Sequence, residues 1–181
     1  MAKNKNTALA RLLYSSMFLA LALLLPFLTA QIKPFGSALC PMHLPVILCG
    51  FICGPSWGVL VGATAPILRS MTFGMPIMMP DAVAMAFELA VYAFVAGTLY
   101  RKLQKNLFMF YVELITAMVC GRLAWGAATF FLIFIGKATG TIAFSVIWTR
   151  TVLQSIPGII LQLVAIPLII SVMKKNRLML N

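Results

Sequence analysis

The chain has 181 residues, of which 62% are hydrophobic and 9% are charged, and its mean hydropathy is +1.04. This composition excludes a soluble domain and indicates an all-α, polytopic membrane protein. Since each crossing needs about 20 apolar residues, residues 1–181 are expected to form one transmembrane domain of six helices, with no room for a soluble domain.

The charges and motifs exclude several other functions. The net charge is +11, but the basic residues lie mainly at the ends of apolar segments, where they set membrane orientation and do not indicate nucleic-acid binding. No G-x-x-x-x-G-K-[ST] loop for ATP occurs. The cysteines suggest neither a disulfide framework nor a metal site, and we interpret Cys49 and Cys53 as small packing residues. No metal or cofactor is expected.

The first apolar segment covers residues 12–28 and follows Lys3, Lys5 and Arg11. It could be a signal peptide or a membrane helix. The Leu-Thr-Ala sequence before Gln31 matches a cleavage site poorly, which favours a retained helix.

Small residues form a strip on this helix. Ser16 and Ala20 are four residues apart, with Ser15 and Ala22 nearby, and such a strip permits close contact between helices. The partner helix could belong to this chain or to another subunit.

The next apolar block covers residues 42–70 and is interrupted by Gly54-Pro55. A Gly-Pro step removes a backbone hydrogen bond, so we predict two short helices, at about 42–54 and 56–71. Short spans interrupted by Gly and Pro are typical of transport sites, where freed backbone groups must face protein or water.

Three further helices are predicted. The sequence TFGMPIMMPD is expected to be an exposed loop, and Pro80-Asp81 begins a helix that continues to about Tyr100. A fifth helix is predicted at about 107–135 and, after a turn at GKATGT, a sixth at about 142–173.

The distribution of Lys and Arg predicts the orientation. The amino terminus, the 101–105 loop and the carboxyl tail carry nine basic residues, whereas the opposite side carries two, Lys33 and Lys137. The positive-inside rule therefore places both termini in the cytoplasm.

Four charged residues within the predicted spans share a similar depth, and they come from four different helices. At about 1.5 Å per residue, Arg69, Glu88, Arg122 and Arg150 all reach the outer half of the membrane. One interpretation is a set of structural pairs plus arginines that extend to outer headgroups. The alternative, which we favour, is an outward-open cavity for a small molecule with a carboxylate or phosphate.

Further polar residues accompany these charges. Tyr92 lies one turn from Glu88, Trp125 is three residues from Arg122, and Gln154 is four from Arg150. Tyr and Trp also favour membrane interfaces regardless of ligand. His43 is either a ligand contact or an interfacial residue. Glu113 is predicted to pair with a basic residue near the cytoplasmic loops, and Gln162 to bond between helices.

The segments PMHLPVILCGFICGPSWGVLVG, PILRSMTFGMP and AMAFELAVYAFVAGTLY, together with the small-residue first helix, resemble the substrate-binding S components of energy-coupling factor (ECF) vitamin transporters. The resemblance implies a bacterial plasma-membrane subunit that binds a vitamin from outside. It further implies docking on a transmembrane T subunit with two cytoplasmic ATPases, and delivery by toppling. The family's A-x-x-x-A contact strip would fall on Ser16 and Ala20, where the first residue is Ser instead of Ala.

The vitamin itself is less well defined, because S components share a fold and differ in ligand. The block is similar to the pantothenate-type group, and the excess of arginines fits a carboxylate. Folate, riboflavin, pyridoxine, alpha-ribazole and a queuosine precursor stay open.

Two other functions compete with vitamin capture. One is an autonomous transporter that couples to protons through Glu88 or Asp81. The other is a membrane enzyme that acts on lipid, which is disfavoured because no nucleophile lies near a base in the sequence.

Overall fold

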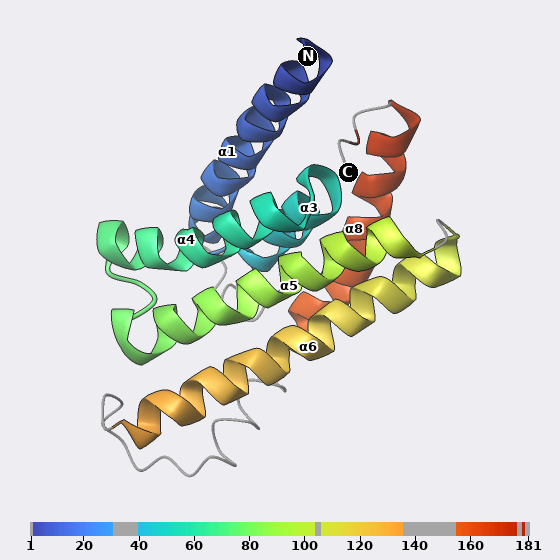
Figure 1. Ribbon diagram of the computed structural model, residues 1–181. Helices are drawn as coiled ribbons and strands as arrows, with labels where there is room; N and C mark the ends of the chain where they lie inside the picture. Colours follow the sequence, from blue (N-terminus) through green and yellow to red (C-terminus); the bar gives the residue numbers. More distant parts are fainter. Residues whose placement is uncertain (1, 31–39, 104–105, 136–154, 177–178, 180–181) are drawn as a thin grey trace.

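The computed structural model describes residues 2–30, 40–103, 106–135, 155–176 and 179, and of residues 2–6 and 28–30 it describes the backbone alone. Within these ranges the chain is helical and has no strand, so the all-α fold class is confirmed (Figure 1). The helices are α1 (Ala2–Ala30), α3 (His43–Cys53), α4 (Pro55–Phe73), α5 (Val83–Lys102), α6 (Leu107–Phe134) and α8 (Ile156–Lys175), and a π-helical turn, η1 (Met78–Ala82), precedes α5.

The predicted break between the second and third helices is confirmed at Gly54. This residue has a φ of 101°, which L side chains rarely adopt, and its N–H donates to the Gly50 carbonyl at 3.2 Å. Pro55 opens α4, where its missing N–H costs nothing because first-turn N–H groups have no helical partner.

The segment between α4 and α5 is exposed, as predicted. Helix α4 ends at Gly74, whose left-handed φ of 69° is typical of a helix terminus. The regular α-helix then begins at Val83, slightly after the predicted start at Pro80-Asp81, because η1 occupies the intervening turn.

Helix α8 coincides with the second part of the predicted sixth helix. It begins at Ile156, directly after Ser155, and continues to Lys175. The first part of that prediction, and the turn at GKATGT, lie outside the described residues.

Four helical segments of the described chain are long and apolar enough to cross a membrane: Thr7–Phe27, Met78–Lys102, Leu107–Phe134 and Ile156–Lys175. The chain is therefore a multi-pass membrane protein. Helix α3 has 11 residues and is about 16 Å long, too short to cross by itself. The count of six crossing helices stays a prediction.

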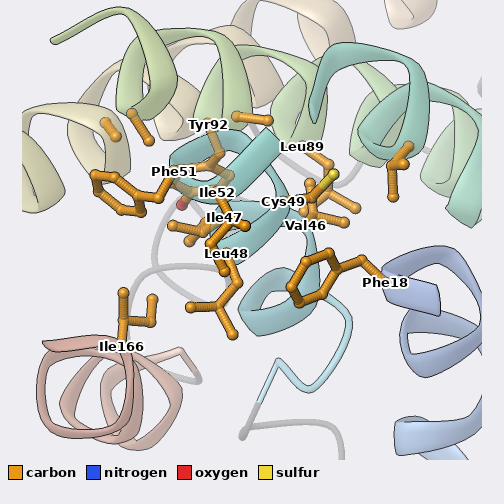
Figure 2. Close-up of a cluster of buried hydrophobic side chains, with 14 of the residues drawn as sticks. Phe18, Val46, Ile47, Leu48, Cys49, Phe51, Ile52, Leu89, Tyr92 and Ile166 are labelled. Carbon is orange, nitrogen blue, oxygen red and sulfur yellow. The ribbon is translucent and has the colours of Figure 1, made fainter. Parts of the chain in front are cut away.

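Helix α3 is the centre of the core (Figure 2). Every residue in it except Leu44 is buried, and α1, α4, α5 and α8 pack around it. A helix that is apolar on all sides is most stable inside a protein. The short second helix is thus enclosed by protein, which holds His43, its first residue, in the interior.

Glycines bring α5 into backbone contact with α3 and α4. A Cβ on Gly50 would lie 2.6 Å from the Ala93 carbonyl oxygen, and one on Gly62 would lie 2.6 Å from the Leu89 carbonyl oxygen. Since no side chain fits in either place, these helices pack with their backbones in direct contact. This packing positions the face of α5 that carries Glu88 and Tyr92.

Candidate substrate-binding site

The centre of the candidate site is an ion pair between neighbouring helices. Glu88 on α5 is 1% exposed, and its Oε1 lies 3.0 Å from Nη1 of Arg122 on α6. A carboxylate inside a membrane protein is costly unless a cation lies beside it. Arg122 provides that charge from the adjacent helix.

A third helix contributes His43. Its Nε2 lies 3.6 Å from the same Oε1 of Glu88, and its ring meets the Tyr92 ring edge to face, with centroids 5.5 Å apart. Helices α3, α5 and α6 therefore deliver His43, Glu88, Tyr92 and Arg122 to one place, called here the Glu88 cluster.

Polar atoms of this cluster are left without hydrogen bonds. Within the described chain, both ring nitrogens of His43, Oε1 of Glu88 and Nε of Arg122 are buried and lack a hydrogen-bond partner. The 3.0 Å contact is an ion pair whose N–H is not aligned well enough to count as a hydrogen bond. Buried polar groups normally have partners, so these atoms are available to the donors and acceptors of a ligand.

Two residues that sequence reasoning did not select border the cluster. The Cys40 thiol interacts with Arg122 and with the Ser155 hydroxyl. Burial raises the pKa of the Cys40 thiol, an effect that the positive charge of Arg122 partly offsets. A neutral thiol results. No pattern in the sequence indicated that this loop residue meets α6 and the start of α8.

A pocket of about 450 Å³ adjoins the cluster. Its volume is within the range of small-molecule sites. Among the described residues that line it, all except Tyr92 and Arg122 are apolar side chains of α6 and α8: Ile115, Met118, Val119, Leu123, Ile159 and Leu163.

Gly121 fixes the position of Tyr92. A Cβ on Gly121 would lie 2.9 Å from the Tyr92 ring, so the ring rests directly on the backbone of α6, one residue before Arg122. The absence of a side chain at Gly121 thereby sets the spacing between the phenol and the guanidinium.

Arg69 lies apart from this cluster. Its Nη1 donates to the Leu23 carbonyl at 2.9 Å, and its guanidinium lies over the rings of Phe27 and Phe73, at 5.1 and 5.9 Å from their centroids. These contacts join α4 to α1. The structure thus brings Glu88 and Arg122 together and places Arg69 at another helix contact.

The remaining site candidates are only partly covered by the structure. Trp125 is half-buried, one turn beyond Arg122 on α6. Arg150 and Gln154 lie outside the described residues. In the part of the chain that is described, no group of three His, Cys, Asp or Glu side chains gathers in a way that could hold a metal ion.

The small-residue strip on α1 divides into two faces. Ser15 and Ala22 are buried against the protein, whereas Ser16 and Ala20 are exposed. The Ser16 hydroxyl donates to the Leu13 carbonyl of its own helix at 2.9 Å. Ser16 and Ala20 therefore present two small side chains on the exposed face of α1, and the Ser16 hydroxyl already has a hydrogen-bond acceptor in its own helix.

Comparison with known proteins identifies the family. The family model described as "ECF transporter, substrate-specific component" matches residues 10–170, most of the chain. Neither the comparison with curated proteins nor that with solved structures gave a match. With its apolar helices, its buried polar cluster and this match, the chain belongs to the family of substrate-specific components of ECF transporters.

Proposed function

We propose that this substrate-specific component captures a small water-soluble vitamin with a carboxylate, with pantothenate as the first candidate. The Glu88 cluster is the observation that carries the proposal, because several of its buried polar atoms have no hydrogen-bond partner within the described chain and lie beside a pocket of about 450 Å³. Nε of Arg122 and the His43 ring are suited to a carboxylate, and Oε1 of Glu88 to hydroxyl or amide donors.

The apolar walls of the pocket support a ligand with a hydrocarbon portion. Pantothenate combines a carboxylate, an amide, two hydroxyl groups and a dimethyl carbon, so it matches both parts of the site. Folate, riboflavin, pyridoxine, alpha-ribazole and a queuosine precursor are the alternatives. A cluster in which Glu88 already neutralises Arg122 also suits a neutral member of this group.

Family membership implies a T subunit and ATPase subunits as partners and a membrane environment. We place the T-subunit contact at Ser16 and Ala20, which are exposed and small. In this proposal the protein works in a bacterial plasma membrane, receives the vitamin from outside and delivers it by toppling. The site candidates Arg150, Gln154 and Trp125 keep their proposed ligand roles, and Arg69 becomes a residue of the α1–α4 contact.

Mass spectrometry of the ligand that copurifies with the protein names the vitamin. Calorimetry with pantothenate then tests the site. Arg122→Lys keeps a cation beside Glu88 but removes the Nε donor, and we expect it to weaken binding by roughly 1.5 to 3 kcal/mol. Arg101→Lys, an exposed change on α5, is the control and should leave the affinity unchanged.

Unchanged binding in Arg122→Lys would remove Arg122 from the ligand site. Uptake into vesicles driven by a pH gradient, without T and ATPase subunits, would instead establish an autonomous proton-coupled transporter.

A further inference from the structure

A second cavity lies away from the Glu88 cluster, where the carboxyl-terminal ends of α5 and α8 meet the start of α6. It has a volume of about 210 Å³. Its polar lining comes from all three helices and the residue before α6: Tyr100, Asn106, Glu113, Ser171 and Lys174.

The two charges of this cavity have opposite sign and different exposure. Glu113 is 1% exposed, and it interacts electrostatically with the buried Tyr100. Lys174 is exposed in the last turn of α8. The cavity therefore has a carboxylate in its interior and a lysine ammonium group at its rim.

An aromatic cluster forms the inner wall. The rings of Phe51, Tyr100 and Phe110 pack together, with centroid separations of 4.9 Å for Phe51–Phe110 and 5.5 Å for Phe51–Tyr100. Tyr100 and Phe110 also line the cavity. Because this wall belongs to the packed core, the shape of the cavity is fixed by the fold.

The position along the membrane follows from the charges. Arg101 and Lys102 end α5, and Lys174 and Lys175 end α8, so the positive-inside rule places this end at the cytoplasmic headgroups. Leu107, which lines the cavity, is 67% exposed. The cavity thus lies at the level of the inner-leaflet headgroups and is bordered by an apolar side chain.

We propose that this cavity binds phosphatidylethanolamine of the inner leaflet by its headgroup. The ammonium group of the lipid enters toward Glu113, and its phosphate lies beside Lys174. An ammonium with three N–H donors forms charge-assisted hydrogen bonds with a buried carboxylate, whereas the trimethylated ammonium of phosphatidylcholine has no N–H to donate. Phosphatidylglycerol lacks a cation for Glu113.

Native mass spectrometry of the full-length protein tests this assignment. The protein is incubated with equal amounts of dioleoyl phosphatidylethanolamine, its mono- and dimethyl derivatives and phosphatidylcholine, which share their acyl chains. We expect retention to fall with each added methyl group and to be about tenfold lower for phosphatidylcholine, the size of effect that loss of hydrogen bonds to a charged group produces. Equal retention of all four lipids would overturn the proposal.

A pair of neighbouring lysines supplies a matched control. Lys174 lines the cavity and Lys175 does not, although both are exposed in the last turn of α8. Lys174→Gln should lower retention of phosphatidylethanolamine severalfold and Lys175→Gln should not. Equal effects of the two changes would show general attraction to the membrane and contradict a defined site.

Glu113→Gln should abolish the preference for phosphatidylethanolamine over phosphatidylcholine while vitamin binding shows that the variant is folded. A preference that survives in this folded variant would contradict the role of Glu113. Soluble phosphoethanolamine offers the same phosphate and ammonium without acyl chains. If it binds as tightly as the lipid, the ligand is a soluble metabolite and the assignment to a membrane lipid fails.

Discussion

Glu88 and Glu113 are equally buried, at 1% exposure each, on two helices that pack along one another, yet their surroundings differ. Glu88 meets Arg122 and His43 from two other helices in the interior. Glu113 lies in a cavity at the end of the helices, with Lys174 at its rim. Burial shows only that a carboxylate needs stabilising neighbours. The side chains that the adjacent helices bring to it determine its role.

The largest expected effect concerns the ion pair. Arg122→Met leaves the Glu88 carboxylate buried without its cation, and we expect a loss of about 3 to 5 kcal/mol in the free energy of unfolding. Adding Glu88→Gln removes the uncompensated charge and should restore part of that stability. Denaturation of the purified protein in detergent measures both variants, and strictly additive losses would show that the two residues do not interact.

The affinity for the vitamin should distinguish the roles of the two glutamates. Glu88→Gln should weaken binding by roughly 1.5 to 3 kcal/mol, because it removes the negative charge of a carboxylate whose Oε1 has no hydrogen bond within the described chain. Glu113→Gln, an identical change at equal burial, should leave the affinity within about twofold. Calorimetry measures both, and an equal loss in the two variants would contradict the separation of the sites.

The contact between Gly121 and the Tyr92 ring belongs to the Glu88 side of this difference. Gly121→Ala would place a methyl group 2.9 Å from the Tyr92 ring, and we expect the displaced ring to reduce stability by roughly 1 to 3 kcal/mol and to weaken vitamin binding. Ala127→Ser, on an exposed position of α6, is the control. Vitamin affinity as in the unmodified protein would mean that Tyr92 does not shape the site.

The smallest effect is expected at Arg69. Arg69→Ala removes one hydrogen bond to Leu23 and the contacts with Phe27 and Phe73, which should cost about 1 to 2 kcal/mol of stability. Vitamin affinity should not change. A clear drop in affinity, measured on the folded variant, would return Arg69 to the ligand site.

Local sequence signals predicted where two of the described helices are separated and where an exposed segment follows. The Gly54-Pro55 break and the exposed segment before α5 follow from backbone preferences of Gly and Pro, which act whatever the neighbouring helices are. That Glu88 and Arg122 lie at a common level also follows from their positions in apolar segments, and their ion pair agrees with it. The contact of Arg69 with α1 did not follow from the sequence. The rise per residue gives the depth of a side chain but not the direction in which it points.

By itself, the sequence determined that this is a multi-pass helical membrane protein of the ECF substrate-component family, and which charged residues lie inside it. Only the tertiary structure decided that Arg122 and not Arg69 meets Glu88, that Cys40 and Ser155 border the cluster, and that Glu113 lies in a separate cavity. The physical reason is that these helices are apolar on most faces. Hydrophobic periodicity therefore carries little information about helix rotation, and close contacts at Gly50, Gly62 and Gly121 set it instead.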